Sequence, residues 1–541
     1  MISKYIKGNK TGRVIVGIII SSVLLFLVLN LLISFIVDGI IKPKQLSKIN
    51  SSEEIQLDIE NISYSLFTNS FTLNNISLTH SAESESGEDS LRITISSVST
   101  EINLMHLMFS DGYKFSGIYI NDPLIRRFTS PIAGTSAGSK ISDNNIFNFL
   151  DTLSRDLHYF SSGMIKINKG IYVNKNMHTG LSDSVINFNI TLNDILFDST
   201  NTGQLKLKVT EEIRLSAEKA IFHLGDMQYK LSLTDLNMDS DNAQLSLSNI
   251  FFGPYLNDDD FFKTKQYRVD RFILEINQID FNELDFRDII HNQVITIGNI
   301  VIDEYMLDAL TNMRLPTDPS ASPPKMPNEI VNEIPFSLNI NKTELKNGNI
   351  YVKELYPYDN NPGVLLLGNL YSTISNIRSN ETANFKIKTK LTGSGDLDFS
   401  FNLGLAPGKL KFDYSGTLGS MSADDLNEFI VISDRVKVNS GSIEQVKFSV
   451  DAFGDSAMAQ AVPFYNNLSI SELDDETGRS TGIMEQFNSF IANTFLIRKN
   501  NPVDDELKKS SVVYVRKEDD AFLEYVWIAL RKAVGDVVGF N

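Results

Sequence analysis

Apolar and polar residues alternate along most of the chain after residue 50, and this pattern limits the fold more than any other feature. Ile186, Phe188, Ile190 and Leu192 form one such run, with polar residues between them. Successive side chains of a strand point to opposite faces, so strict alternation predicts a sheet with one apolar face and one polar face. Such runs recur every ~8–12 residues with turn residues between them, which favours antiparallel hairpins and meanders.

The clearest alternating runs supply the residues that we expect to line the apolar face. These are Leu205, Leu207, Leu231, Leu233, Leu245, Leu247, Phe385, Ile387, Leu397, Phe399, Phe401 and Phe448. Few segments have helical periodicity, so few helices are available to cover this face. The sheet must therefore fold onto a second sheet, curl on itself, or hold something apolar.

Three segments do have helical periodicity. Residues 146–153 predict a short helix capped by Ser142 or Asp143, and residues 483–495 predict a second one. Residues 521–538 predict an amphipathic helix, and its apolar stripe contains Phe522, Val526, Ala529, Leu530, Ala533 and Val537. This helix either covers one end of the sheet or docks on a membrane. The mixed charge of its polar face favours the cover.

Residues 14–37 form one charge-free, apolar run, and a basic cluster precedes it: Lys4, Lys7, Lys10 and Arg13. At ~1.5 Å per residue, a helix of this length spans a ~30 Å hydrocarbon core. The run is too long for a secretory h-region and no small-x-small cleavage pattern follows it, so we favour a retained anchor over a cleaved signal peptide. The basic cluster predicts a cytoplasmic N-terminus and an exported body.

The anchor residues that we expect to contact lipid are Val14, Ile18, Leu24, Phe26, Leu31 and Phe35.

The chain has no cysteine, so it contains no disulfide framework and no thiolate metal site. Its net charge of −18 argues against nucleic acid as a partner, because phosphate binding requires clusters of Lys and Arg.

Short phrases recur along the chain. Gly117–Asn121 reads Gly-Ile-Tyr-Ile-Asn, Gly170–Asn174 reads Gly-Ile-Tyr-Val-Asn, and related phrases begin at Gly298 and Gly348. Their irregular spacing excludes a solenoid of fixed period but favours a repeated supersecondary unit. We expect each glycine to allow a tight entry into a strand. The alternative is that such phrases are common in strands of any kind.

The order of the segments resembles the AsmA-like family of bacterial envelope proteins. After the N-terminal run come the strand phrase Ile118–Ile125 with its Asp-Pro exit, a variable linker, the segment Asn145–Leu153 and a strand at Ile165–Gly170. The later segments that are also similar to the family are Ile300–Asp303, Ile334–Leu338, Leu345–Ile350, Ala459–Ile470, Ala492–Arg498 and Tyr525–Trp527.

This resemblance implies a mainly β protein that is similar in build to bridge-like lipid transfer proteins. We expect an N-terminal transmembrane helix, an elongated, curled antiparallel β-sheet that forms a β-groove, a few short helices and a C-terminal amphipathic helix. The expected divisions are 1–13 (cytoplasmic), 14–37 (anchor), 38–160 (first β-module), 161–315 (central β-repeats), 316–333 (Pro-rich linker), 334–515 (second β-module) and 516–541 (helix).

The resemblance also implies a function in phospholipid transport or outer-membrane assembly. The protein would cross the inner membrane once, with its body in the periplasm, and would hold phospholipid acyl chains. An outer-membrane or periplasmic protein would be its partner. Burying acyl chains is favourable by ~0.8 kcal/mol per CH₂, so the apolar face alone could hold a lipid. The alternative is a structural or regulatory envelope protein with closed, dry β-sandwich cores.

No motif in the sequence requires an enzyme, a cofactor or a metal ion. Gly134–Gly138 matches the Gly-x-Ser-x-Gly nucleophile elbow, but it lies in a Ser/Gly-rich linker without the strand and helix that the motif needs. No two histidines have the spacing of zinc ligands. Asp258–Asp260 and Asp474–Glu476 lack the alternating spacing of calcium loops, so we interpret both as solvated turns. A hydrolase built around Ser136 remains the third hypothesis.

Overall fold

The computed structural model describes residues 10–50, 55–84, 87–102, 113–129, 159–198, 206–209, 212–224, 228–473 and 497–539. The chain forms two compact units, which we describe separately. Unit 1 comprises Met1–Asp226 and Thr234–Asp241, and unit 2 comprises Met227–Leu233 and Asn242–Asn541.

Unit 1 begins with helices and continues with strands. Its helical elements are α2 (Lys10–Ile36), the π-helical turn η1 (Val37–Ile41) and α3 (Lys42–Ile49). Its strands are β1 (Ile55–Ser65), β2 (Ser70–Ser84), β3 (Gly87–Ile102), β4 (Tyr113–Asn121), β5 (Leu124–Thr129), β6 (Tyr159–Asn176), β7 (Ser182–Asp198), β8 (Lys206–Val209) and β9 (Ile213–Leu224). Strand β10 (Tyr229–Asp239) contributes residues to both units.

Unit 2 contains the longer strands and the short helices. Its strands are β11 (Gln244–Pro254), β12 (Asp270–Leu284), β13 (Val294–Asn312), β14 (Ser337–Leu355), β15 (Gly363–Arg378), β16 (Thr382–Leu391), β17 (Gly395–Gly404), β18 (Lys411–Leu418), β19 (Met421–Ser422), β20 (Val436–Phe453), β21 (Ser456–Glu472) and β22 (Ser510–Val515). Its helices are α6 (Asp258–Lys263), α7 (Phe286–Asn292), α8 (Pro327–Glu333), η3 (Ala423–Leu426), α9 (Asn427–Ser433) and α11 (Phe522–Val538). The predicted mainly β class, with its N-terminal and C-terminal helices, is confirmed.

Most strand pairs of the described residues are antiparallel, as expected, but the sheet is mixed because it also contains parallel pairs. Strands β13 and β14 pair in parallel, and β6 pairs in parallel with both β4 and β5. A parallel step needs a long return connection. In unit 2 that connection is the Pro-rich segment 316–333, which contains α8 and joins two neighbouring strands of one unit.

The same topology occurs once in each unit. In unit 1, β3 pairs antiparallel with β4 and β5, these pair in parallel with β6, and β6 pairs antiparallel with β7. In unit 2, β12, β13, β14 and β15 repeat this sequence of pairings. The recurring Gly phrases lie in the strands of the parallel pairs, at β4 and β6 and at β13 and β14.

A row of residues with left-handed backbone conformation occurs in several strands of each unit. In unit 2 the row contains Asn249, Glu304, Asn347 and Asn369, and in unit 1 it contains Asn75, Lys169 and Asn187. All seven are exposed, and we call them the left-handed row. Asparagine is enriched in this conformation because its short side chain forms local hydrogen bonds.

Members of the left-handed row bond to side chains that lie opposite them in the register. The β12–β13 pairing places Asn277 opposite Glu304, and the Asn277 amide donates to the Glu304 carboxylate at 3.1 Å. Asn75 and Glu60 form a corresponding bond between β2 and β1. A left-handed residue interrupts the pleat and bends the strand, so left-handed residues at matching register positions bend neighbouring strands at the same place.

Two glycines beside the left-handed row sit under aromatic rings of the next strand. A Cβ on Gly170 would overlap the Phe188 ring, and a Cβ on Gly348 would overlap the Tyr305 ring. Both glycines lie in the middle of their strands, β6 and β14, and not at the strand entry that the sequence predicted. The ring of the neighbouring strand shields the glycine backbone, which compensates for the missing side chain.

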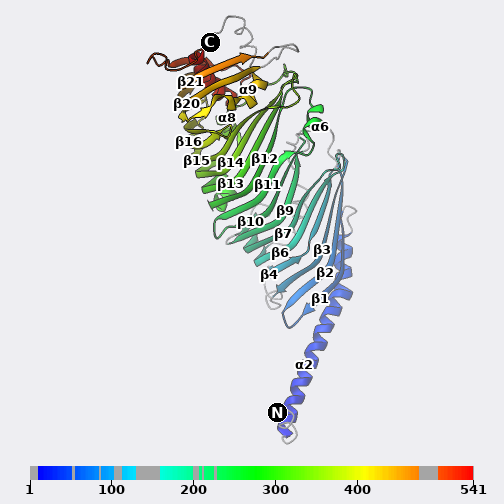
Figure 1. Ribbon diagram of the computed structural model, residues 1–541. Helices are drawn as coiled ribbons and strands as arrows, with labels where there is room; N and C mark the ends of the chain where they lie inside the picture. Colours follow the sequence, from blue (N-terminus) through cyan, green and yellow to red (C-terminus); the bar gives the residue numbers. More distant parts are fainter. Residues whose placement is uncertain are drawn as a thin grey trace. The chain divides into compact units, whose positions relative to one another are not determined.

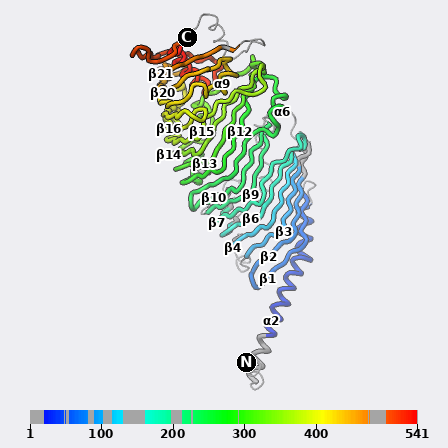
Figure 2. Tube along the Cα trace, viewed as in Figure 1, coloured from blue at the N-terminus to red at the C-terminus, as the bar shows by residue number. Residues whose placement is uncertain are grey.

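The first helices lie along β1, the edge strand of unit 1 (Figures 1 and 2). Side chains at every fourth helical position face the strand, and they are Phe26, Asn30, Ser34, Asp38 and Lys42. The helical segment is long and apolar enough to cross a membrane.

We predict that Gly348→Ala destabilises the protein by roughly 1–3 kcal/mol, because the added Cβ must displace the Tyr305 ring from a packed position. The matched control is Gly368→Ala on the adjacent strand β15, where the nearest atom to an added Cβ is at an ordinary 3.6 Å. Thermal unfolding of both full-length variants in detergent measures the difference. Equal stability of the two would show that the ring moves aside freely.

Candidate functional site

Most of the residues predicted to line the apolar face lie on one face of unit 2. The pairing register places Leu245 opposite Phe281, and continues strand by strand through Ile300, Thr343, Ile374, Phe385, Phe401, Tyr414, Val450, Ala459 and Val512. Directly paired residues share a face. The adjacent row of the register likewise connects Leu247 with Ile387, Phe399 and Phe448.

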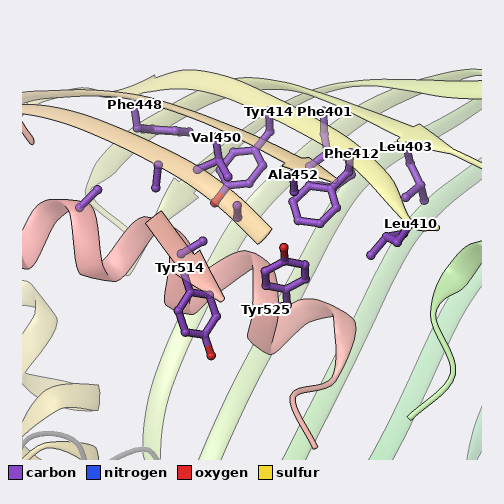
Figure 3. Packing of buried hydrophobic residues seen from close by; sticks show 14 of the residues in the cluster. Phe401, Leu403, Leu410, Phe412, Tyr414, Phe448, Val450, Ala452, Tyr514 and Tyr525 are labelled. Atoms are coloured by element: carbon purple, nitrogen blue, oxygen red, sulfur yellow. The ribbon is translucent and has the colours of Figure 1, made fainter. Parts of the chain in front are cut away.

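The C-terminal part of this face is covered by α11. The hydroxyl of Tyr414 donates to the Val526 carbonyl at 2.7 Å, and the Phe401 ring contacts the Phe522 ring edge-on at a centroid distance of 6.0 Å. Figure 3 shows Tyr525 of α11 pointing toward Phe412 of β18. The structure therefore supports the first interpretation of the C-terminal helix, as a cover for the sheet.

Close contact between α11 and the sheet depends on small side chains. Ala529 and Ala533 of α11 are completely buried, as are Ala457, Ala459 and Ala461 of β21. Alanines on both surfaces let the helix approach the strands closely, so packing excludes other molecules from this region.

Five of the predicted lining residues are part of this protein core and do not face an open surface. They are Phe385, Leu397, Phe399, Phe401 and Phe448. Phe401 and Phe448 are buried, and the other three pack against the buried cluster. The same cluster contains Tyr525, Ala529 and Ala533 of α11. The expectation that these five residues contact lipid stays a prediction.

Short helices cover two other apolar patches of unit 2. Phe286 and Ile289 of α7 pack with Leu245 and with the buried residues Leu284, Ile297 and Ile300. Phe261 and Phe262 of α6 pack on Tyr229 and Leu310 at the ends of their strands. Of the remaining predicted residues, Leu233 is buried, and Leu231, Leu247 and Ile387 are partly exposed. Leu205 and the side chain of Leu207 lie outside the described residues.

Two apolar ladders cross unit 1, one on each side of the left-handed row. The first joins Leu57, Leu78, Ile93, Ile125, Tyr172, Val185 and Ala220. The second joins Ile62, Leu73, Val98, Ile120, Ile167, Ile190 and Leu215. All residues of the second ladder are partly exposed, and the described helices of unit 1 pack along the edge strand β1. These ladders are the candidate binding surface.

The anchor residues divide into two groups. Leu24, Leu31 and Phe35 are highly exposed on α2, as expected for side chains that contact lipid. Phe26 instead packs against Phe67 in the β1–β2 turn. Val14 and Ile18 lie within α2, but their side chains are outside the described residues.

The acidic clusters have internal partners. Asp258 of α6 binds the buried Arg271 at 2.9 Å, and Asp260 binds Lys263 at 2.9 Å. Among the described residues, one group of three carboxylates could approach a cation, and it comprises Glu212, Asp239 and Asp241. The guanidinium of Arg214 forms ion pairs with all three, so it offsets one of their three negative charges. The segments 134–138, 146–153, 474–476 and 483–495 lie outside the described residues.

A buried polar cluster lies beside α11. Burial raises the pKa of Glu354, whose carboxylate accepts a hydrogen bond from the Tyr356 hydroxyl. Burial, reinforced by the negative charge of Asp520, also raises the pKa of Glu524 to about 7. Glu524 belongs to the first turn of α11, so its protonation is coupled to the helix that covers the face.

Sequence reasoning missed the left-handed row and the polar stripe on the anchor helix. The stripe could have been found, because Asn30 and Ser34 are polar residues at i, i+4 spacing inside an apolar run.

No protein-family model matches the chain, and no curated protein is similar enough to count as a relative.

We predict that the stability of the wild-type protein falls as the pH rises from about 4.5 to about 7, because the folded state holds the Glu524 proton more tightly than the unfolded state does. The stabilisation from the protonated form is complete below pH ~4.5 and is lost as the pH rises through ~7. The Glu524→Gln variant has no carboxyl group to titrate at this position. Its melting temperature should therefore fall less than that of the wild type between pH ~5 and pH ~8.

The matched control for this experiment is Glu518→Gln, which changes an exposed carboxylate in the loop before α11. Differential scanning calorimetry of the full-length protein in detergent gives the melting temperatures. A Glu524→Gln variant with the pH dependence of the wild type would exclude Glu524 as the responsible group.

Proposed function

We propose that this protein is a membrane-anchored, non-enzymatic carrier that holds lipid acyl chains on the apolar face of its sheet. The observation that carries the proposal is the pair of ladders in unit 1. Both are apolar and continuous across the strands, and every residue of the second ladder is partly exposed. An apolar surface of this extent needs a partner, and acyl chains gain ~0.8 kcal/mol for each CH₂ that they bury on it.

The N-terminal helix supports a location at a membrane. It is long and apolar enough to cross the bilayer once, and the basic residues before it favour a cytoplasmic N-terminus. By the resemblance to the AsmA-like family, we propose the inner membrane of a two-membrane envelope, with the body in the periplasm. Phospholipid transport or outer-membrane assembly would then be the process that the carrier serves, with an outer-membrane or periplasmic protein as acceptor.

One observation favours the second hypothesis, a structural protein with a closed core. The face beneath α11 is packed with protein side chains, as a closed sandwich would be. We therefore propose that the C-terminal part of unit 2 is a closed protein core, and that lipid contacts the ladders of unit 1.

A photo-crosslinking amino acid at Ile167 tests the proposal. Ile167 lies in the second ladder, and its chain neighbour Lys166 points to the opposite face of β6 and is exposed. We predict that ultraviolet irradiation of cells yields phospholipid adducts at position 167 that exceed those at position 166 by roughly tenfold, because the two positions face opposite sides of one strand. Mass spectrometry of the purified protein detects the adducts.

The same amino acid at Phe401 is a second control, because α11 covers that position. Equal adduct levels at positions 166 and 167 would contradict the carrier hypothesis. Strong adducts at position 401 alone would instead show that α11 leaves the sheet and that the C-terminal part holds the lipid.

A further inference from the structure

The turn between β1 and β2 carries an exposed aromatic residue that contacts the anchor helix. Phe67 is 68% exposed, and its ring packs edge-on against Phe26 of α2 at a centroid distance of 4.7 Å. A strand turn would ordinarily carry polar residues at this position. If α2 crosses a membrane, the depth of Phe67 in the bilayer is therefore fixed by the depth of Phe26.

Helix geometry places Phe26 inside the hydrocarbon core. Phe26 lies 12 residues after Val14, where the charge-free run begins. At ~1.5 Å per residue this is a rise of ~18 Å, well short of the ~30 Å thickness of the core. Beyond Phe26, the side of the helix that faces away from β1 remains apolar, since Leu31 is 69% exposed and Phe35 is 70% exposed.

Strand backbone at this depth is tolerated only if its polar groups are satisfied, because the bilayer core supplies no water. The polar stripe of the helix, Asn30, Ser34 and Asp38, bonds to backbone groups along the free edge of β1. Leu66 N–H donates to Asn30 Oδ1 at 2.8 Å, and Ile62 N–H donates to Asp38 Oδ1 at 2.9 Å. Between them, Ser34 Oγ both accepts from Tyr64 N–H and donates to the Tyr64 carbonyl, each at 3.1 Å.

The turn itself also satisfies its polar side chains internally. The Tyr64 hydroxyl donates to Asn69 Oδ1 at 2.6 Å, and the hydroxyls of Thr68 and Ser70 are 2.7 Å apart. Phe67 is the large apolar side chain that the turn leaves exposed. The turn thus combines satisfied polar groups with an exposed ring, which is the chemistry that the interface of a bilayer accepts.

We infer that the β1–β2 turn is inserted in the outer part of the bilayer beside α2, so that the sheet begins within the membrane. The partner of this surface is the phospholipid leaflet itself. The inference depends on α2 crossing the membrane and is independent of lipid carriage. It also explains Asn30 and Ser34, which would be costly in an apolar helix without the edge of β1 as their partner.

Tryptophan fluorescence tests the insertion. Trp527 is the single tryptophan of the chain, so Trp527→Phe provides a background without tryptophan. In this background, Phe67→Trp is compared with Met177→Trp, which lies in the exposed turn between β6 and β7. Register places that turn at the Leu57 end of the strands, opposite to the end that carries Phe67.

Both full-length variants are reconstituted in phosphatidylcholine/phosphatidylglycerol nanodiscs, with and without bromine on the acyl chains. We expect bromine to reduce the emission of the Phe67→Trp variant by roughly half, because the new indole would lie at acyl-chain depth. The emission of the Met177→Trp variant should stay unchanged. The inference is overturned if the two emissions change equally or if neither changes.

Cysteine labelling gives a second, independent measurement because the chain has no cysteine of its own. In nanodiscs, Phe67→Cys should resist a charged maleimide that labels Met177→Cys rapidly. After transfer to denaturing detergent, both should react. Rapid labelling of position 67 in nanodiscs would place the turn in water. Neither outcome depends on lipid adducts at Ile167, so this inference and the carrier proposal can fail separately.

Discussion

The fold contains one local backbone constraint, the left-handed residue that interrupts several strands of each unit at corresponding positions. A non-glycine residue in this conformation is uncommon, and a row of them aligned in the register is an organised feature. The cross-strand bonds of this row, such as Asn277 to Glu304 and Asn347 to Asp303, keep the bends of neighbouring strands at one position.

The two units treat their apolar faces differently. In unit 2, α6, α7 and α11 each supply side chains that bury a patch of the face, and the alanines of α11 and β21 make the last contact dense. In unit 1, the described helices pack along the edge strand β1 and do not cover the apolar face. The same alternating sequence pattern thus produces a protein core where a helix is present, and an accessible apolar surface where the described chain provides none.

The sequence predicts the class of the fold because alternation is a direct consequence of strand geometry. Leu245 and Phe385, which are far apart in the chain, were correctly expected on one face, and the C-terminal helix was found from its 3.6-residue period. The parallel steps were missed because the sequence of a single strand does not record the direction of its neighbour. The covering of Phe401 was missed because the position of α11 is a tertiary property. The left-handed row does leave a trace, since apolar residues change from odd to even numbers between Leu247 and Ile250, with Asn249 between them.

The architecture is suited to growth by duplication, because its contacts are mostly between neighbouring strands. A strand contacts mainly the two strands beside it, so an inserted hairpin would need to match only its immediate neighbours and would not require a redesigned core. The parallel step that occurs once in each unit is consistent with such a history of copied segments. Proteins built on this plan could differ greatly in length while retaining the same pairing between neighbouring strands.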